Sequence, residues 1–430
     1  MVSSRLTVPR AVLAAALVFG VAACGSDSGG GAAPPGPAAL DGVGPISLVT
    51  GKDTSGNLQN QVDEWNSAHP DQKVTVIELP EDADAQRQQM VQNAQTGSAT
   101  YGVLNLDVVW TAEFAANQWI TQLPDAEFPL DKLLPETVET GKYFKHLYAV
   151  PITSDGGLLY YRKDLLDAAG LKPPTTWAEM AQDCAKVLPS NPGVSCYAGQ
   201  FEKYEGLTVN FSEAVNSAGG SVVGDDGKPT LNTDGARKGL QFLVDGVKSG
   251  EIPQKARTFK EEEGRRAFQA GELLFHRQWP YQYAKASATD GSSTVAGKFA
   301  VAPLPGLDGP GASSLGGHNY AISAFTKNKK TALEFIKYSA SEDQQRKNLE
   351  KTSQAPTWAG LYDDQALVAK FPYLTVLKKS IENARKRPAV VKYQEVSQAI
   401  QDAAYAAMSG ATPVDQALQS LQGKLETLTK

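Results

Sequence analysis

The chain has 430 residues and a formal net charge of −6, with 41 Lys and Arg against 47 Asp and Glu. That length exceeds the size at which one hydrophobic core stops growing, so we expect more than one domain. The acidic balance argues against a nucleic-acid partner, which needs a strong positive field. With four His, three Cys and no two His at the spacing of a helical zinc site, neither a metal nor another cofactor is expected.

The N-terminal residues 1–23 have the features of a secretion signal. Arg5 and Arg10 precede an apolar stretch that is too short to span a bilayer as a stable helix. The stretch ends in Val21-Ala22-Ala23-Cys24, which resembles the lipobox of bacterial lipoproteins, so we expect cleavage before Cys24 and a lipid on its thiol. The following residues, 24–44, are rich in Gly and Pro and predict a flexible tether. The protein is therefore expected outside the cytoplasm, anchored to the bacterial cell membrane by its lipid.

After the tether, short apolar runs alternate with amphipathic helical stretches, which is the pattern of an α/β fold. Three such βα units in about 70 residues predict a largely parallel sheet. The expected elements are a strand at Ile46 to Thr50, a helix carrying Leu58, Val62 and Trp65, a strand at Val74 to Leu79, a helix at Gln86 to Ala94, a strand at Leu104 to Trp110, a polar interruption at 125–139 and an extended segment at Tyr148 to Ile152.

From Leu158 the chain becomes more helical and predicts a second lobe. Cys184 and Cys196 have eleven residues between them, and outside the cytoplasm this pair predicts a disulfide contributing roughly 2 to 3 kcal/mol. A redox role is less favoured because the spacing is not C-x-x-C. The other expected elements are a helix opened by a capping box at Thr176 to Glu179, a helix with the apolar face Leu240, Leu243, Val244 and Val247, strands at Phe299 to Leu304 and, after a Gly-rich loop, Asn319 to Ser323, and a last helix whose cap and first turn are Thr412-Pro413.

Several short motifs carry a family resemblance. They are Asp107-Val-Val-Trp110, the run from Val150 to Leu166, Tyr204-Glu-Gly206, Arg277-Gln-Trp279-Pro-Tyr281, Ala302-Pro-Leu-Pro305, Leu315-Gly-Gly317 and Arg387-Pro388. From about residue 45 to the C-terminus the chain resembles the extracellular solute-binding proteins of carbohydrate ABC importers, specifically the trehalose/maltose-binding group. The Trp-Pro-Tyr, Leu-Gly-Gly and Arg-Pro elements, in this order, point to disaccharide binders.

The resemblance implies an α/β fold of two lobes with a ligand cleft between them, joined by crossings near residues 150, 302 and 355. Lobe one would combine 45–150 with 303–354, and lobe two would combine 151–302 with 355–430. The implied function is that of a monomeric, non-enzymatic receptor. It would capture a disaccharide such as trehalose or maltose and deliver it to the permease subunits of an ABC importer.

A sugar offers many hydroxyls and weakly apolar ring faces, so its site needs charged or amide groups and flat aromatic walls. The resemblance places a wall at Trp279 and Tyr281, and within the acidic run 261–263 it favours Glu261. His318 stands where the resembling proteins carry an aromatic residue, which puts a second wall in doubt. The expected ligand-binding residues are Asp53, Asn57, Arg87, Asp107, Asp155, Glu261, Trp279, Tyr281, Gly316, Gly317, His318 and Arg387.

Other interpretations of these residues and of the function stay open at this point. Asp107 would also suit a helix cap, Asp155 a turn before two glycines, and Arg87 a solvated helix face. The same fold would suit a maltodextrin, another oligosaccharide or a polyol derivative. Asp107 and Asp155 could also form the carboxylate pair of an exported glycosidase, although no common hydrolase motif is present.

Overall fold

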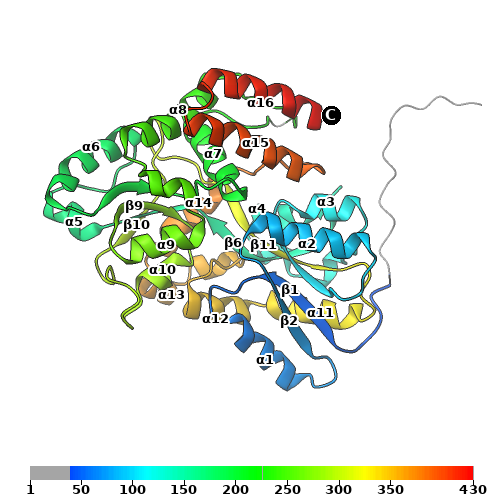
Figure 1. Ribbon diagram of the computed structural model, residues 1–430. Coiled ribbons are helices and arrows are strands. Elements are labelled where there is room, and N and C mark those ends of the chain that lie inside the picture. Colours follow the sequence, from blue (N-terminus) through cyan, green and yellow to red (C-terminus); the bar gives the residue numbers. More distant parts are fainter. Residues whose placement is uncertain (1–38, 225, 430) are drawn as a thin grey trace, which may run out of the picture. The chain divides into compact units, whose positions relative to one another are not determined.

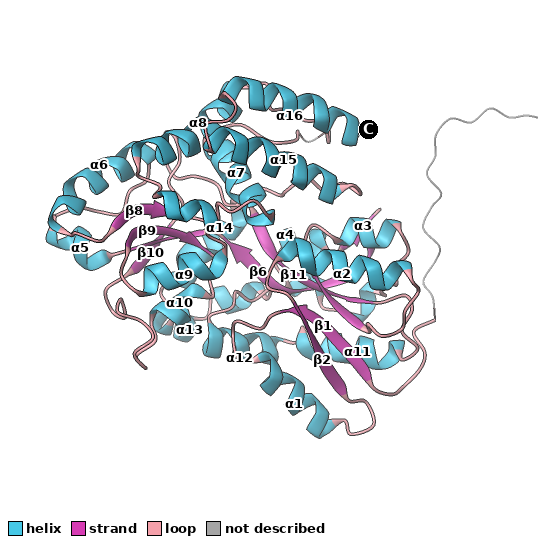
Figure 2. Ribbon diagram, in the orientation of Figure 1, coloured by secondary structure: helices cyan, strands magenta, loops and turns pink. Residues whose placement is uncertain are grey.

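The computed structural model describes residues 39–224 and 226–429, which form two large β-sheets and one two-stranded sheet, with helices packed around them (Figures 1 and 2). The predicted secretion signal, Cys24 and most of the predicted tether lie outside the described residues. Among the residues that are described, no helix is both long enough and apolar enough to cross a membrane.

The first sheet has five strands in the order β2-β1-β3-β11-β6. Strand β1 pairs in parallel with β2 and with β3, as the βα pattern predicts. Strand β11 instead runs antiparallel to both β3 and β6. Figure 1 shows that this strand, from late in the chain, lies among elements from its beginning. The strands are β1 (Ile46–Gly51), β2 (Val74–Leu79), β3 (Val103–Asp107), β6 (Ala149–Gly156) and β11 (Leu315–Ile322).

Helices cover both faces of this first sheet. Because successive strand residues point to opposite faces, Leu48 of β1 packs in one core with Phe335, while the neighbouring Val49 packs in another with Met90. Burial on both faces explains why β1 is an apolar run without alternation. The helices are α1 (Leu58–Ala68), α2 (Ala83–Gln95), α3 (Thr111–Ala116), α4 (Pro135–Thr140), α11 (Lys329–Ser339) and α12 (Glu342–Thr352). The polar interruption also contains the short helices η1 (Asp125–Glu127) and η2 (Leu130–Lys132), and it is followed by the hairpin of β4 (Lys142–Tyr143) and β5 (His146–Leu147).

The second sheet has four strands in the order β10-β7-β9-β8. Strand β9 is central, and all six of its residues are buried. The strands are β7 (Leu158–Tyr161), β8 (Ser195–Ala198), β9 (Leu273–Gln278) and β10 (Ala300–Ala302). The helices of this part are α5 (Lys163–Ala168), α6 (Trp177–Val187), α7 (Glu205–Ser217), α8 (Asp234–Ser249), α9 (Glu261–Gln269), α10 (Gln282–Ala286), α13 (Gln365–Lys370), α14 (Tyr373–Glu382), α15 (Tyr393–Met408) and α16 (Val414–Leu428), with the short turns η3 (Leu188–Ser190), η4 (Gln254–Thr258) and η5 (Ala359–Tyr362).

Several element ends differ from the sequence prediction. The strand expected to reach Trp110 ends at Asp107, because the Asp107 carboxylate accepts the Val109 N–H at 3.1 Å and turns the chain toward α3. Strand β11 begins at Leu315, so the two glycines expected in a loop lie within a strand. The strand expected at 299–304 is limited to 300–302, and Pro413 precedes rather than opens α16. The capping box at Thr176 and Glu179 is confirmed.

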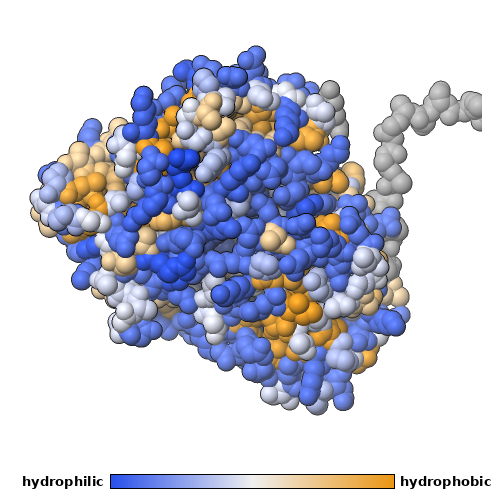
Figure 3. Space-filling model, viewed as in Figure 1, coloured by the Kyte–Doolittle hydropathy of each residue, from blue (hydrophilic) through white to orange (hydrophobic). Residues whose placement is uncertain are grey.

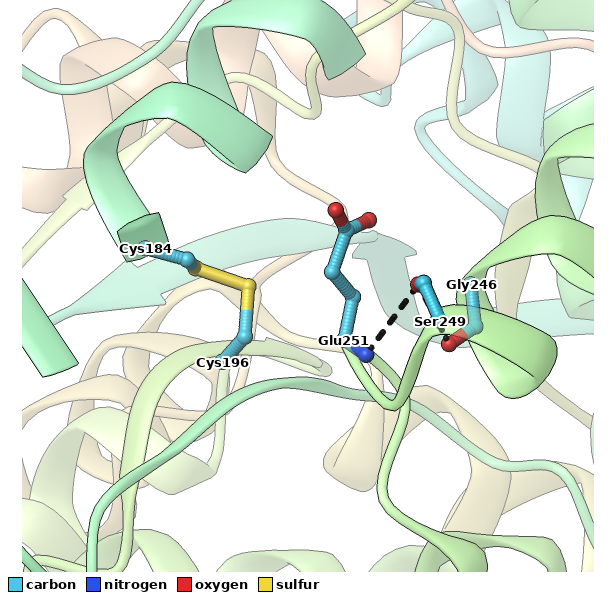
Figure 4. The surroundings of a disulfide bond; sticks show 5 residues. All are labelled: Cys184, Cys196, Gly246, Ser249 and Glu251. Atoms are coloured by element: carbon cyan, nitrogen blue, oxygen red, sulfur yellow. Dashed lines mark hydrogen bonds between the residues drawn. A yellow bond between two sulfur atoms is a disulfide. The ribbon is translucent and has the colours of Figure 1, made fainter. Parts of the chain in front are cut away.

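The predicted disulfide between Cys184 and Cys196 is present, with a Cα–Cα distance of 5.4 Å. It joins the end of α6 to β8, beside the turn that carries Ser249 and Glu251 (Figure 4). This turn is tied to the same strand, because the Tyr197 N–H donates to the Glu251 carbonyl at 3.0 Å. The bridge therefore anchors a helix to the edge strand of the second sheet.

Candidate ligand-binding site

A cavity of about 280 Å³ is lined by residues from both sheets and their loops. On the face shown in Figure 3, hydrophilic side chains predominate and apolar ones form smaller patches. Ten of the twelve predicted ligand-binding residues line the cavity. They are Asp53, Asp107, Asp155, Glu261, Trp279, Tyr281, Gly316, Gly317, His318 and Arg387.

The first sheet brings its contributions together at one edge. Asp107 is the last residue of β3, and Asp155 lies near the end of β6. Strand β11 runs the other way and starts at this edge, so His318 lies opposite Asp107 and Gly316 lies opposite Asp155. In open α/β sheets the carboxyl ends of strands are where ligands bind.

Trp279 follows β9 and is supported from behind by a buried cation. The Arg277 guanidinium lies 3.8 Å from the centroid of the Trp279 ring, which is the geometry of a cation–π contact. Arg277 donates to both carboxylate oxygens of Glu213, at 2.7 and 2.5 Å, and to Gln200 Oε1 at 3.0 Å. We call Arg277, Glu213 and Gln200 the Trp279 support cluster. It fixes the plane of the ring and does not itself line the cavity.

Gly316 and Gly317 leave room for close neighbours. A Cβ on Gly316 would lie 2.9 Å from two ring atoms of Trp279, so β11 approaches the aromatic wall as only glycine allows. Gly317 has φ of 114° and a Cβ there would lie 2.2 Å from the carbonyl oxygen of Thr153. Both glycines are thus explained by packing against protein atoms, in addition to any approach of a ligand.

Arg387 links the two sheets through two carboxylates. Its side chain is 2% exposed and donates to Asp107 Oδ1 at 2.7 Å and to Glu205 Oε1 at 2.6 Å. Glu205 opens α7 and also accepts hydrogen bonds from the hydroxyls of Tyr393 and Ser397. Burial raises the pKa of Glu205 to about 7, although Arg387 opposes this shift. We call Arg387, Asp107 and Glu205 the Arg387 cluster.

Asp155 lines the cavity, and no described residue donates a hydrogen bond to its carboxylate. Among the carboxylates of the lining, Glu81 shares this property. Burial raises the pKa of Asp155 to about 7, while Arg277 lowers it and Asp107 raises it. A carboxylate held in this way can accept hydrogen bonds from the hydroxyls of a ligand.

The start of α9 adds two more carboxylates to the lining. Glu261 accepts a hydrogen bond from the Tyr204 hydroxyl at 2.7 Å, and burial raises its pKa. Glu262 accepts from the Tyr281 hydroxyl at 2.8 Å. Both glutamates line the cavity, whereas Glu263 does not.

The comparisons with known proteins identify the family. Residues 51–346 match the family described as bacterial extracellular solute-binding protein. This chain belongs to that family. It is 35% identical over 364 residues to a probable ABC transporter-binding protein of Deinococcus radiodurans, covering 82% of this chain and 86% of that one.

Solved structures show the same fold for this solute-binding protein. Maltose-bound MalE3 of T. maritima is 33% identical, with a TM-score of 0.85, and the match covers 89% of this chain and 99% of that one. A solute-binding protein of Agrobacterium radiobacter in complex with ribitol is 26% identical, with a TM-score of 0.79 and coverage of 90% and 99%. The predicted two-lobe α/β fold is therefore confirmed, while the lobe boundaries at 150, 302 and 355 stay a prediction. The family consists of transport proteins rather than enzymes.

Two predicted ligand-binding residues of this solute-binding protein do not line the cavity. Asn57 is buried, and its side-chain amide donates to Asn348 Oδ1 at 2.9 Å. Arg87 forms a bidentate ion pair with Glu113, in which its Nε lies 2.8 Å from Oε2. The donors of both side chains are thus engaged by protein groups on the first-sheet side.

His318 enters the lining as a neutral group. Burial lowers the pKa of its imidazole, so the ring is uncharged at neutral pH. A neutral imidazole offers a ligand one hydrogen-bond donor and one acceptor. Among the described residues, no group of three or more His, Cys, Asp and Glu side chains is placed to hold a metal ion.

The sequence prediction missed Glu205 and Arg277 as contributors to this site. Both lie within motifs that carry the family resemblance, Tyr204-Glu-Gly206 and Arg277-Gln-Trp279. A charged residue next to a predicted aromatic wall is the signal that could have revealed Arg277. Its partner Glu213 lies 64 residues away, and no local pattern connects the two.

Proposed function

We propose that this solute-binding protein captures a neutral disaccharide, such as maltose or trehalose, and delivers it to the permease subunits of an ABC importer. The observation that carries the proposal is the pairing of a rigid aromatic wall, Trp279 on Arg277, with the cavity-lining groups Asp107, Asp155 and Arg387. Stacking on a sugar ring and bidentate hydrogen bonds to its hydroxyls are what such groups provide. MalE3, which holds maltose in its solved structure, supports the choice of ligand.

The charges of the lining favour a ligand without negative charge. Lys52 and Arg387 are its two cationic residues, and Arg387 is neutralised by its own partners. A phosphorylated sugar would enter a lining in which carboxylates outnumber cationic side chains, so its negative charge would be repelled. The acidic lining residues are Asp53, Glu81, Asp107, Asp155, Glu205, Glu261 and Glu262.

A neutral polyol is the second candidate ligand. It is favoured by the ribitol-bound structure from Agrobacterium radiobacter, which is 26% identical to this chain. A polyol offers hydroxyls without a ring face, so it would use the carboxylates and Arg387 but gain less from Trp279. A maltodextrin or another oligosaccharide would differ from a disaccharide in how far it extends beyond the wall.

The proposal includes the cellular setting. The protein is exported, anchored through a lipid on Cys24, and acts as a monomer that returns its ligand intact to the permease. Support for export comes from the family, which is extracellular, and from the N-terminal signal. Because the family is not one of enzymes, the alternative of a glycosidase acting through Asp107 and Asp155 is disfavoured.

Isothermal titration calorimetry of the full chain, with Cys24→Ser to prevent lipidation, tests the proposal. The titrants are maltose, trehalose, maltotriose, ribitol, glucose and glucose 6-phosphate, and the recovered sugar is analysed for hydrolysis. We expect micromolar binding of one intact neutral disaccharide, which requires about −8 kcal/mol. Binding of glucose 6-phosphate alone, or release of glucose from maltose, would overturn it.

Trp279→Ala tests whether the cavity is the binding site. Loss of the stacked ring is expected to weaken the affinity for the bound sugar by about a hundredfold, as for other buried aromatic anchors. Trp279→Phe is the matched control, because it keeps a flat ring over Arg277 and should retain part of the affinity. Unchanged affinity in Trp279→Ala would show that the sugar does not bind in this cavity.

A further inference from the structure

The starts of α2 and α9 meet at the rim of the cavity. Asp82 precedes α2 on the first-sheet side, and Lys260 precedes α9 on the second-sheet side. Lys260 Nζ lies 2.6 Å from Asp82 Oδ2, and the two side chains are 25% and 26% exposed. The neighbours Glu81 and Glu261 line the cavity. A partly buried ion pair thus joins the two sides directly beside the candidate site.

Lys260 is held in position from its own side. Its Nζ lies 5.4 Å from the centroid of the Tyr204 ring and 3.8 Å from Glu202 Oε1. Tyr204 is in turn fixed by its hydrogen bond to Glu261. A cation that is already oriented loses little conformational freedom when it pairs with Asp82. The entropic cost of forming the ion pair is therefore small, and a larger part of the electrostatic attraction stabilises it.

The first turn of α2 makes a second contact across the rim, through hydrogen bonds instead of an ion pair. The Asp84 carboxylate accepts hydrogen bonds from Gln394 and Gln401 of α15, each at 3.3 Å. Helix α15 packs on α7 of the second-sheet side. Asp82 and Asp84 therefore tie one end of α2 to two separate elements across the rim, and neither carboxylate lines the cavity.

We propose that the Lys260–Asp82 ion pair is a latch that stabilises the arrangement in which the two sides enclose the ligand, and that it slows ligand release. The inference rests on the proposed function and deepens it, because it names positioning residues for that site. Separating the two sides breaks the pair, and neither Asp82 nor Lys260 lines the cavity. An interaction present only in the enclosing arrangement shifts the population toward it and lowers the release rate.

Two substitutions remove the pair with little other change. Asp82→Asn keeps the side-chain oxygen that accepts the Ala85 N–H at 3.0 Å and caps α2, but removes the charge. Lys260→Met keeps an apolar stem beside Tyr204. The matched control is Lys255→Met, because Lys255 pairs with Glu272 at 2.5 Å and both lie on the second-sheet side.

The test combines release kinetics with a distance measurement. Stopped-flow fluorescence follows the release of maltose, and pulsed electron paramagnetic resonance measures distances between spin labels at the exposed positions 59 in α1 and 419 in α16. Both use the full chain carrying Cys24→Ser. We expect Asp82→Asn and Lys260→Met to speed release roughly three- to tenfold and to lengthen the ligand-free distances, while Lys255→Met leaves both unchanged.

Salt and the double variant sharpen the result. The difference between the parent and the single variants should shrink at high ionic strength, and Asp82→Asn/Lys260→Met should release no faster than the faster single variant. Release rates and distances equal to those of the parent would overturn the latch. If calorimetry shows that the parent binds another of the tested sugars, that sugar replaces maltose in the release assay. If the parent binds none of them, the proposed function fails, and the distances in the ligand-free chain alone decide whether the latch exists.

Discussion

Two buried arginines, Arg277 and Arg387, are 1% and 2% exposed, yet they belong to regions of the site that differ in construction. In the Trp279 support cluster, both partners of Arg277 come from the second-sheet side, and the guanidinium lies behind the wall. In the Arg387 cluster, the carboxylates come from both sides, Asp107 from β3 and Glu205 from α7, and the guanidinium lines the cavity.

The difference teaches that burial and pairing do not by themselves indicate what an arginine does in a binding protein. An arginine whose partners share one rigid body acts as a fixed support. An arginine whose partners lie on two bodies changes its surroundings when those bodies move and when a ligand competes for its donors. We therefore expect perturbation of the first cluster to appear mainly in stability, and perturbation of the second mainly in affinity.

Glu213→Gln breaks the support cluster and should have the largest effect. It leaves the Arg277 guanidinium buried without a charged partner, which costs about 3 to 5 kcal/mol of unfolding free energy. Urea unfolding followed by fluorescence measures the loss. Glu272→Gln is the control, because Glu272 is 46% exposed and its pair with Lys255 should contribute no more than about 1 kcal/mol. A loss below 1 kcal/mol in Glu213→Gln would contradict the supporting role.

The support cluster also marks the limit of what the sequence predicts. Trp279 and Tyr281 are predicted as wall residues from a local motif, and both line the cavity. The position of Arg277 beneath the ring depends on Glu213 and Gln200, which are 64 and 77 residues away. Pairing over such distances follows from tertiary packing, and the periodicity of a single strand or helix carries no information about it.

In the fold, too, local patterns of the sequence predict the order of elements, but they do not predict pairings between distant segments. The order of strands and helices from Ile46 to Asp107 follows from apolar periodicity, and the structure confirms it within a few residues. The insertion of β11 between β3 and β6 is not visible in that pattern, because its partners lie about 160 to 220 residues earlier in the chain. Arg87 illustrates the consequence at the site, since its pairing with Glu113 of α3 could not be read from its own helix.

Arg387→Lys tests the second cluster and should affect affinity more than stability. A lysine carries one point charge and cannot fork between Asp107 and Glu205. Glu205 keeps the hydroxyl donors of Tyr393 and Ser397, whereas Asp107 keeps only the backbone N–H of Val109. We expect the affinity for the bound sugar to fall about tenfold to thirtyfold, or roughly 1.4 to 2 kcal/mol, in calorimetry.

The control for this substitution is Arg385→Lys, which makes the same chemical change at an exposed position two residues away. It should leave both affinity and stability near those of the parent. If Arg387→Lys lowers the unfolding free energy as much as Glu213→Gln does while the affinity stays unchanged, the two clusters are both supports and the distinction between them fails.

The pKa of Asp155 depends on residues of both clusters. Burial raises this pKa to about 7; Arg277 of the first cluster lowers it, and Asp107 of the second raises it by a smaller amount. The ionised carboxylate is the form that accepts hydrogen bonds from ligand hydroxyls, so binding favours loss of the proton. As pH falls below 7, the ligand-free protein takes up a proton that binding must release. The affinity should then fall by up to about tenfold per pH unit, and calorimetry at pH 6 and pH 8 measures this.

Two variants separate Asp155 from other groups that titrate nearby. Asp183→Asn should keep the full pH dependence, because Asp183, whose pKa burial raises to about 6, lies on α6 outside the cavity lining. Asp155→Asn should bind more weakly and show less than about a threefold change between pH 6 and pH 8. Any residual slope would belong to Glu205 and Glu261, the other lining carboxylates whose pKa burial raises. Equal affinity of the parent at both pH values would mean that binding changes no protonation state between pH 6 and pH 8, which would contradict the proposed ionisation of Asp155 on binding.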